Sequence, residues 1–409
     1  MKLTTCLLAV GLAVPLAAAA EQPPASSATG ETVALELPHN TPVLSRVAER
    51  LDAPWGMDWL PNGDILVTEK FGSLRLIRNG KLVDAPVSGT PDVFAGGQGG
   101  LLDVSVHPDF ASNRWVYLTY SVGTEESNRL NVGRGQWVDG TLADFETVFE
   151  VTQNKDGGQH FGSRLLWLDD GTLMVSIGDG GNPPRRYGGG LIREQSQNLD
   201  TYFGKIVRIH ADGRVPDDNP FLGRPDARPE VFSYGHRNVQ GIALQARTGR
   251  IFASEHGSQG GDELNIVVAG SNYGWPVVTH AVEYGPERTP ISDERSRPGM
   301  ADPVAVWSPA IAPSGATFYT GDVYPDWRGN LFLGAMRIAG RPNPGALIRV
   351  TLSGDGEVTA QERLDLGQVR VRDVQQGPDG YLYVLTTGID GSRTEGTRNG
   401  ALWRIERAR

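Results

Sequence analysis

Short apolar stretches alternate with turn sequences along nearly the whole chain, and amphipathic helical patterns are almost absent. One arrangement recurs: a turn, four or five residues that favour β-strands, and a second turn that contains glycine. Six stretches follow it: NGDILVTEKFGSLRLI (62–77), NRWVYLTYS (113–121), DGTLMVSIGDG (170–180), TGRIFASEHG (248–257), RGNLFLGAMR (328–337) and DGYLYVLTTG (379–388). This pattern predicts an all-β fold built from repeated strands.

The spacing of the six stretches indicates the architecture. Equivalent positions lie 51 to 80 residues apart, and repeats of about 40 to 50 residues made of short strands are typical of propeller blades. The longer intervals then contain loop insertions. A second apolar stretch follows two of the copies, at 345–352 and 400–406, and is expected to form an outer strand. We predict a six-bladed β-propeller over residues 41–409, with a generic all-β fold of coincidental spacing as the alternative.

The N-terminus has the pattern of a secretory signal peptide. A lysine near the start, an apolar core and a run of small residues precede Glu21. The apolar core is too short to span a membrane, and no other apolar run is long enough. We expect residues 1–20 to be removed and residues 21–40 to form an N-terminal extension, for which disorder is one interpretation. The mature protein is then a soluble periplasmic one.

Composition narrows the range of partners. The net charge of −10 and the pI of about 5.3 argue against nucleic acid or an anionic membrane surface as a partner. The one cysteine, Cys6, lies in the predicted signal peptide. The mature chain therefore forms no disulfide, and its stability has to come from a large core or a bound metal.

Two candidate catalytic groups lie near the ends of one predicted strand. His160 lies about ten residues before the strand of the third copy, and Asp179 follows that strand in SIGDGG. An imidazole acts as a general base when a carboxylate fixes its tautomer and stabilises its protonated form. Spacing alone does not decide between such a pair and a histidine that caps a loop.

Two further motifs suggest ligand binding. SYGHRNVQG (233–241) places Arg237 and Asn238 just before a strand, where a guanidinium can pair with a carboxylate or polarise a carbonyl oxygen. SEHGSQGGDELN (254–265) combines acidic residues with exposed backbone, and both are ligands that Ca²⁺ accepts. A solvated turn and a glycine-rich turn are the respective alternatives.

A third motif carries paired arginines. In QVRVRDV (368–374), the two-residue period of a strand puts Arg370 and Arg372 on the same face. Two guanidinium groups on one face can bind an anion, and a salt-bridged exposed face is the alternative reading of the same pattern.

Taken together, the motifs resemble the soluble quinoprotein sugar dehydrogenases of the glucose/sorbosone dehydrogenase family, most closely the aldose sugar dehydrogenase branch. The resemblance covers about four fifths of the chain, and its specificity comes from the order of the motifs. They are GGQGGLLDVSVHPDF (96–110), HFGSRLLW (160–167), IGDGG (177–181), QNLDTYFGKIVRI (197–209), YGHRNVQG (234–241), GDELNIVVAGSNYGWP (261–276), APSG (312–315) and VRVRDV (369–374).

The resemblance implies a six-bladed propeller that binds pyrroloquinoline quinone (PQQ) and Ca²⁺ and oxidises the anomeric hydroxyl of aldoses to a lactone. It implies that His160 is the general base for the C1 hydroxyl proton and that Asp179 orients it. Gln98 would contact substrate and cofactor. Arg237 and Asn238 would bind the reactive quinone oxygens, where the arginine can stabilise developing negative charge.

The resemblance also implies how cofactor and metal are held. Arg370 and Arg372 match an arginine pair that binds the cofactor, whose three carboxylates suit guanidinium groups. Arg337 is included on charge alone, because another branch of the family has lysine there. Backbone carbonyls of Gly257 and Ser258 would hold Ca²⁺, and the carbonyl role tolerates serine where that other branch has proline.

Three functions are compatible with these features. The first is a dehydrogenase for aldoses, including oligosaccharides, that passes electrons to an external quinone, cytochrome or dye, because the sequence has no CxxCH haem motif. The second is a Ca²⁺-dependent lactonase-like hydrolase, since propellers also host that chemistry. The third is a binding propeller without catalysis.

Overall fold

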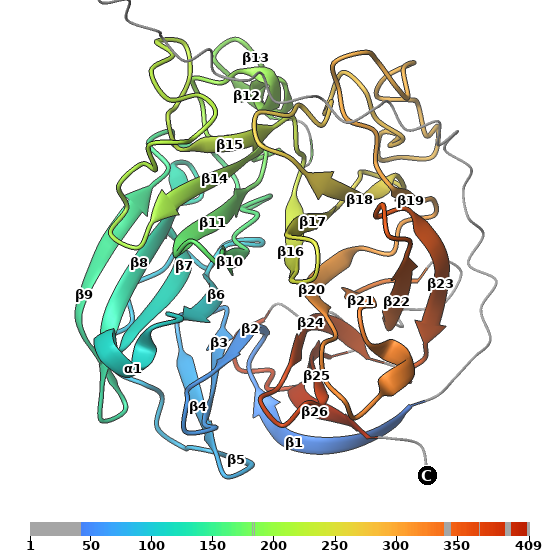
Figure 1. The fold of residues 1–409 in the computed structure, drawn as a ribbon. Coiled ribbons are helices and arrows are strands. Elements are labelled where there is room, and N and C mark those ends of the chain that lie inside the picture. The colour runs from blue at the N-terminus through green and yellow to red at the C-terminus, as the bar shows by residue number, and fades with distance from the viewer. Residues whose placement is uncertain are drawn as a thin grey trace, which may run out of the picture.

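The structure is a computed structural model that describes residues 42–181, 183, 185–338, 345–367, 369–388 and 394–406. The predicted signal peptide, 1–20, and the predicted extension, 21–40, lie outside the described residues. Within the described ranges, six four-stranded antiparallel sheets surround a central axis (Figure 1). The six-bladed propeller expected from the repeats is confirmed.

The first three blades follow each other along the chain. Blade 1 consists of β2 (Pro54–Trp59), β3 (Ile65–Glu69), β4 (Leu74–Arg78) and β5 (Lys81–Leu82). Blade 2 consists of β6 (Leu101–Val106), β7 (Trp115–Gly123), β8 (Asn128–Val138) and β9 (Thr141–Glu150). Blade 3 consists of β10 (Leu165–Trp167), β11 (Thr172–Ile177), β14 (Lys205–His210) and β15 (Val231–Tyr234).

The other three blades complete the ring. Blade 4 consists of β16 (Val239–Gln245), β17 (Arg250–Glu255), β18 (Asp262–Val267) and β19 (Ala305–Trp307). Blade 5 consists of β20 (Pro313–Phe318), β21 (Leu331–Ala335), β22 (Ala346–Leu352) and β23 (Val358–Leu364). Blade 6 consists of β24 (Arg370–Gln376), β25 (Leu382–Thr387), β26 (Gly400–Glu406) and β1 (Val43–Leu51).

Small elements connect these strands. A two-stranded hairpin and a 3₁₀-helix lie in the connection between β11 and β14, and a short helix and a second 3₁₀-helix lie in blades 2 and 5. They are β12 (Arg186–Tyr187), β13 (Gly190–Leu191), η1 (Ile192–Gln197), α1 (Phe110–Asn113) and η2 (Pro325–Trp327). In Figure 1 the hairpin lies at the top of the view, beyond blade 3.

The six recurring stretches contain the second strand of each blade, from β3 to β25. All six residues of β11 are buried, because this strand lies between β10 and β14 and packs against neighbouring blades on both faces. The expectation that the apolar stretches 345–352 and 400–406 form outer strands is wrong by one position. They form β22 and β26, the third strands, and β23 and β1 lie outside them.

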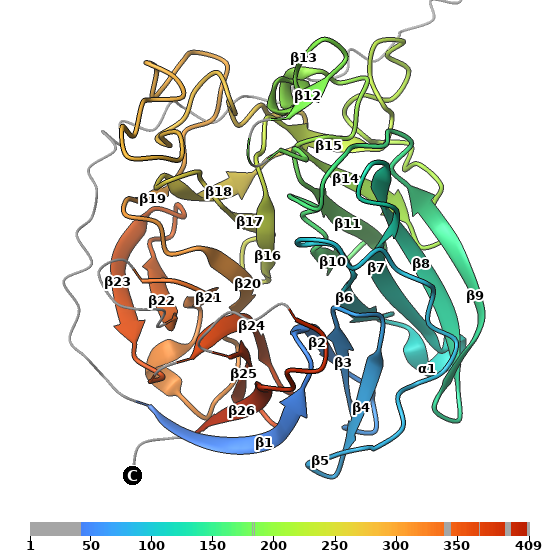
Figure 2. The ribbon, with the colours of Figure 1, turned by 180° about the vertical axis from the view of Figure 1, so that it is seen from behind.

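The ring closes by pairing the start of the described chain with its end. β1 runs antiparallel to β26, with Val43 opposite Glu406 and Leu51 opposite Gly400. Figures 1 and 2 both show β1 as the outer strand of the sheet that contains β24, β25 and β26. Blade 6 is therefore built from two segments far apart in the sequence, and this shared sheet leaves no gap between the first and last blades.

The innermost strands share an irregularity. A register shift, typical of a β-bulge, separates the first residues of β2, β6, β16, β20 and β24 from the rest of the strand. The equivalent position beside the bulge varies between blades and holds either glycine or a charged residue. In blade order these residues are Gly56, Asp103, Arg164, Gly241, Gly315 and Asp373.

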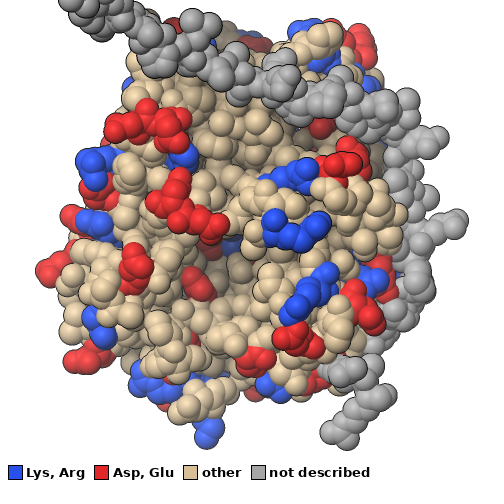
Figure 3. Space-filling model, in the orientation of Figure 1, with Lys and Arg blue, Asp and Glu red and all other residues tan. Residues whose placement is uncertain are grey.

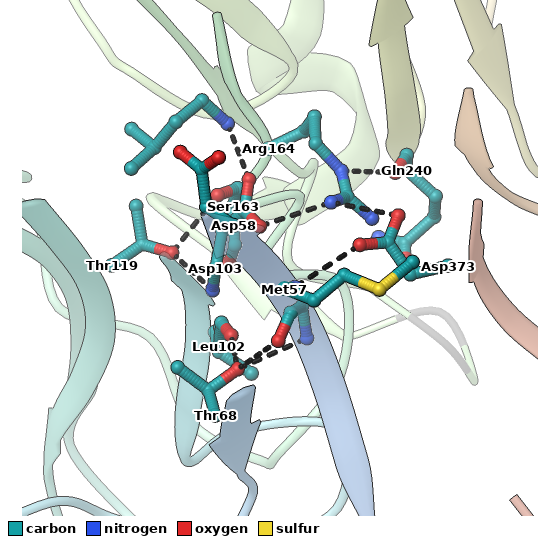
Figure 4. Close-up of polar contacts among 12 residues, drawn as sticks. Met57, Asp58, Thr68, Leu102, Asp103, Thr119, Ser163, Arg164, Gln240 and Asp373 are labelled. Carbon is teal, nitrogen blue, oxygen red and sulfur yellow. Dashed lines mark hydrogen bonds and ion pairs between the residues drawn. The ribbon is translucent and has the colours of Figure 1, made fainter. Parts of the chain in front are cut away.

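The three charged residues at this position meet at the centre of the ring (Figure 4). Arg164 Nη1 lies 2.9 Å from Asp103 Oδ1 and 3.2 Å from Asp373 Oδ1, and all three residues are buried. The glycines give them room: a Cβ on Gly56 or Gly315 would overlap a carboxylate oxygen. Burial raises the pKa of Asp103 to about 7, and this ion network joins blades 2, 3 and 6.

Loop insertions occur where the intervals between repeats are longest. Residues 178–204 connect β11 to β14, and residues 268–304 connect β18 to β19. One face of the ring is hollowed at its centre, as Figure 3 shows, with acidic and basic side chains around the hollow. Among the described residues, no helix has the length and apolar character needed to cross a bilayer.

Candidate active site

His160 lies in the loop that precedes β10 of blade 3, and its own backbone is strained. Its φ is +49°, in the left-handed region that non-glycine residues rarely occupy. Gly178 allows the loop to approach, because a Cβ at that position would overlap the carbonyl of His160. The strained backbone therefore holds the imidazole against the end of β11, where Asp179 begins the next loop.

His160 and Asp179 form a buried pair. His160 Nδ1 lies 2.5 Å from Asp179 Oδ1, and Asp179 also accepts hydrogen bonds from Trp275 Nε1 at 2.8 Å and Gly181 N at 3.0 Å. Burial alone would raise the pKa of Asp179, but His160, the charge of Arg237 and the backbone amide of Gly181 lower it below its ordinary value. Burial, reinforced by the charge of Arg237, lowers the pKa of His160.

These shifts define the protonation of the pair. Asp179 is an anion and His160 is neutral near pH 7, with its proton on Nδ1 facing the carboxylate. Among the described residues, none forms a hydrogen bond with Nε2 of His160. The lone pair on Nε2 is thus able to accept a proton from a substrate, and the two predicted residues have the geometry of a general base and its orienting group.

Gln98 and Asn238 form hydrogen bonds with the backbone of the His160 loop and with each other. Gln98 Oε1 accepts a hydrogen bond from His160 N at 3.2 Å and one from Asn238 Nδ2 at 3.5 Å. Asn238 Oδ1 accepts one from Gly162 N at 3.1 Å. The structure therefore brings together Gln98, His160 and Asn238, which belong to three separate motifs in the sequence.

Arg237 lies beside the same cluster. Its Nη1 donates to the carbonyl of His256 at 2.9 Å and to that of Gly257, and its Cζ lies 5.2 Å from the ring centre of Trp275. Nε of Arg237 is buried and has no hydrogen-bond partner among the described residues. Trp275 also binds Asp179, so one indole touches both the guanidinium and the orienting carboxylate.

Arg370 and Arg372 line a pocket at the centre of the ring. The pocket has a volume of about 90 Å³, and its lining contains these two arginines, Lys70 and Gln98 but no carboxylate. Arg372 Nη2 donates to Gln240 Oε1 at 2.9 Å, and its Cζ lies 4.0 Å from the ring centre of Trp55. The two predicted arginines thus line one pocket, together with Lys70.

A larger pocket adjoins the first and has a volume of about 580 Å³. Gly257, Ser258 and Arg337 line it, and His256 lines both pockets. Burial lowers the pKa of His256 to about 3, so this imidazole is neutral at every physiological pH. The structure therefore places Arg337 in a pocket next to that of the arginine pair.

The acidic residues of the 254–265 motif are already used by the protein. Asp262 accepts hydrogen bonds from the backbone amides of Gly257, Ile311 and Ala312 at 2.7 to 2.8 Å. The described ranges hold no group of three or more His, Cys, Asp or Glu side chains that could hold a metal ion. A cation bound at the 254–265 motif would depend on backbone carbonyls and on oxygen atoms of a bound cofactor.

Three residues that contact the predicted site were not predicted by the sequence patterns: Trp275, Glu255 as a hydrogen-bond acceptor, and Lys155. Lys155 is buried, and its Nζ donates to Asn128 Oδ1 at 3.0 Å and to the carbonyl of Gly157 at 2.7 Å. Burial lowers the pKa of Lys155 to about 7. The only signal in the sequence was proximity, because Lys155 lies five residues before His160.

With the geometry established, comparison with known proteins identifies the family. A model of the glucose/sorbosone dehydrogenase family matches residues 51–395. The chain belongs to this family. It is 41% identical over 349 residues to the aldose sugar dehydrogenase YliI of Escherichia coli, which covers 84% of this chain and 89% of that protein. The recognition of the family from the order of its motifs is confirmed.

Solved structures of family members share the fold. The apo-form of the soluble aldose sugar dehydrogenase from Escherichia coli superposes with a TM-score of 0.80 at 38% identity, covering 90% of this chain and 99% of the other. The PQQ-bound aldose sugar dehydrogenase from Streptomyces coelicolor gives a TM-score of 0.69 at 29% identity, again with 90% and 99% coverage.

Proposed function

We propose that this protein is a PQQ- and Ca²⁺-dependent aldose dehydrogenase that oxidises the C1 hydroxyl of aldoses, including oligosaccharides, to the lactone. The observation that carries the proposal is the buried His160–Asp179 pair, in which Nε2 of His160 is available. The pair lies next to Arg237 and to two pockets that are lined with cations. Similarity to two aldose sugar dehydrogenases, one of them in a PQQ-bound form, supports the same activity.

Three residues of this chain have separate roles at the reacting carbon. His160 Nε2 takes the proton of the C1 hydroxyl, and Asp179 holds the ring in the tautomer that leaves Nε2 free. The guanidinium of Arg237 lies where it can stabilise negative charge that develops on an oxygen beside this base. Bound PQQ would supply the acceptor for the hydride of C1, and bound Ca²⁺ would supply a Lewis acid.

The cations of the two pockets fit an anionic cofactor. PQQ carries three carboxylates, and Arg370, Arg372 and Arg337 supply three guanidinium groups around adjoining pockets. Arg237 Nε is a further buried donor for which the described residues provide no acceptor. Asn238 and Gln98 would complete the polar contacts, since both lie within hydrogen-bond distance of the His160 loop.

The carbonyls of Gly257 and Ser258 are the ligands we assign to Ca²⁺. A neutral set of carbonyls leaves the charge of the ion to be balanced by the anionic cofactor, which explains how the site can function without a carboxylate cluster. In the structure the carbonyl of Gly257 accepts a hydrogen bond from Arg237. Binding of the ion would therefore require Arg237 to share or release this oxygen.

Location and electron transfer complete the proposal. We infer that residues 1–20 direct the protein to the periplasm and are then removed, and that residues 41–409 are the catalytic domain. The sequence after Cys6 contains no cysteine for a haem or iron–sulfur relay. Electrons then pass from the reduced cofactor to a separate quinone, cytochrome or artificial dye.

A dye-reduction assay over a panel of sugars tests this function. Purified apoprotein is assayed with PQQ alone, Ca²⁺ alone, both and neither. We expect dye reduction by aldoses only when both are present, and no reduction with sugars that lack a free anomeric hydroxyl. Failure to bind PQQ, together with hydrolysis of sugar lactones in the presence of Ca²⁺, would replace this proposal by the hydrolase.

A further inference from the structure

A second histidine–carboxylate pair lies in blade 4, near the place that His160 and Asp179 occupy in blade 3. His236 precedes β16 as His160 precedes β10, and Glu255 ends β17 as Asp179 follows β11. Both pairs are separated by 19 residues in the sequence. His236 Nδ1 lies 3.1 Å from Glu255 Oε1, so the contact between the two side chains is repeated as well.

The two pairs differ at the other ring nitrogen. Nε2 of His236 lies 2.9 Å from Ser233 Oγ, whereas the described chain offers His160 Nε2 no such partner. Ser233, His236 and Glu255 have the order of a hydrolase triad, but their exposed fractions are 0%, 0% and 4%. Ser233 holds Nε2 of His236, and we place no catalytic step at this second pair.

Glu255 connects the second pair to Arg237. Its Oε2 accepts a hydrogen bond from the backbone amide of Arg237 at 2.6 Å, and its Oε1 accepts one from Asn265 Nδ2 at 3.1 Å. The carbonyl of Arg237 in turn accepts a hydrogen bond from the backbone amide of Asp179 at 2.8 Å. The peptide of Arg237 is therefore held between the carboxylate of one pair and the backbone of the other.

A neighbouring acid shares a hydrogen-bond donor with Glu255. Glu263 shares the side-chain amide of Asn265 with it, at 3.4 Å. Burial, together with the charge of Glu255, raises the pKa of Glu263 well above its ordinary value. The amide of Asn265 thus bridges the two carboxyl groups, and Glu255 is the one that accepts a hydrogen bond from the backbone of Arg237.

We propose that Ser233, His236 and Glu255 form a positioning relay that sets the guanidinium of Arg237 for the cofactor. The relay fixes the backbone of Arg237, and the side chain then extends along Trp275 to the carbonyls of His256 and Gly257. Ser233 keeps the imidazole in the tautomer that donates to Glu255. This inference rests on the proposed function, because it assigns Arg237 to the cofactor.

A double-mutant cycle tests the relay through cofactor affinity and not through turnover. Glu255→Gln, Arg237→Ala and the double variant are titrated with PQQ in the presence of Ca²⁺, and their unfolding temperatures are measured. We expect Glu255→Gln to weaken PQQ binding about tenfold, as outer-shell changes do at metal sites. In the Arg237→Ala background the same change should leave PQQ affinity unaltered, while it still lowers the unfolding temperature.

The matched control is Glu362→Gln, which removes a buried carboxylate that pairs with Arg349 on blade 5, at 2.7 Å. It should lower the unfolding temperature and leave PQQ affinity unchanged. If Glu255→Gln does not fold, Ser233→Ala takes its place in the cycle, with the same coupling expected at a smaller magnitude.

Two outcomes would overturn the relay. Additive losses of PQQ affinity would mean that Glu255 acts without Arg237, and an unchanged affinity in Arg237→Ala would remove the residue that the relay positions. Both differ from failure of the proposed function, in which the unmodified protein itself does not bind PQQ.

Discussion

Two histidines that precede the first strands of neighbouring blades have different chemistry because one hydrogen-bond partner differs. Both donate from Nδ1 to a carboxylate, but Ser233 occupies Nε2 of His236, and no described residue occupies Nε2 of His160. The available lone pair makes His160 the candidate base. At the scale of single residues, function therefore depends on which polar atom the fold leaves unbonded.

The orienting carboxylate can be tested directly. Asp179→Asn removes the charge that fixes the His160 tautomer, so we expect kcat to fall about 10²- to 10⁴-fold. PQQ affinity should change little, because within the described ranges Asp179 bonds to His160, Trp275 and the backbone. Steady-state kinetics and a PQQ titration measure the two quantities. Asp322→Asn, an exposed carboxylate, is the matched control, and an equal loss in both variants would contradict the assignment.

The pH dependence of kcat/KM tests whether the cation Lys155 acts on His160. Lys155 lies near His160, and its positive charge, like that of Arg237, lowers the pKa of the imidazole. Removing this charge in Lys155→Met should raise the pKa of His160. Since only neutral His160 can accept the proton, the acid side of the kcat/KM profile should move to higher pH. A profile that stays in place or moves to lower pH would show that Lys155 does not act on His160.

The sequence motifs contain the candidate residues of the site but did not indicate the residues that support them. Gln98, His160, Asp179 and Asn238 lie in short motifs near strand ends, where a propeller gathers functional groups. Trp275 gave no such signal, because it reaches Asp179 from a loop 96 residues away in the sequence. Its contact depends on how blades 3 and 4 pack together, and local residue patterns carry no information about that packing.

At the scale of elements, the innermost strands combine a common bulge with different residues at one position. The six repeats predicted the second strands, because their apolar residues are buried on both faces. The first strands are irregular and carry buried charges, so neither alternation nor a continuous apolar run identifies them. Asp103, Arg164 and Asp373 could not be predicted to meet, because each belongs to a different blade.

In blades 1 and 5, glycine at this position is required by the aspartate of the neighbouring blade. Gly315→Ala would place a Cβ on the Asp373 carboxylate, and we expect it to lower the free energy of unfolding by about 3 kcal/mol. Gly354→Ala is the matched control, because nothing lies within 4 Å of a Cβ there. Thermal or urea unfolding measures both variants. Equal stability of the two would mean that the inner strand can move away from the network.

At the scale of the whole molecule, the ring depends on a contact between the two ends of the propeller. The repeats predicted the number of blades but not that β1 completes the last one, since the β1 stretch does not resemble the recurring pattern. Pairing of β1 with β26 joins segments about 350 residues apart. Such closure makes the stability of all six blades depend on one outer strand.

A proline in the closing strand tests this dependence. Ala48 is buried and pairs with Leu402 in the middle of β1. Ala48→Pro removes a backbone donor there and should cost about 3 kcal/mol of unfolding free energy. Val43→Pro, at the exposed first position of the strand, should be nearly neutral. Circular dichroism during heating measures both, and equal unfolding temperatures would show that closure contributes little.

The account's central claim is that His160 accepts the proton of the aldose C1 hydroxyl at a cofactor site that other residues build. The most direct test is the rate at which an aldose reduces PQQ in a single turnover, in the unmodified protein and in His160→Ala, each loaded with PQQ and Ca²⁺. We predict nearly equal PQQ affinity for the two proteins and reduction at least about 10³-fold slower in the variant. Reduction at the unmodified rate, with PQQ fully bound, would contradict the claim.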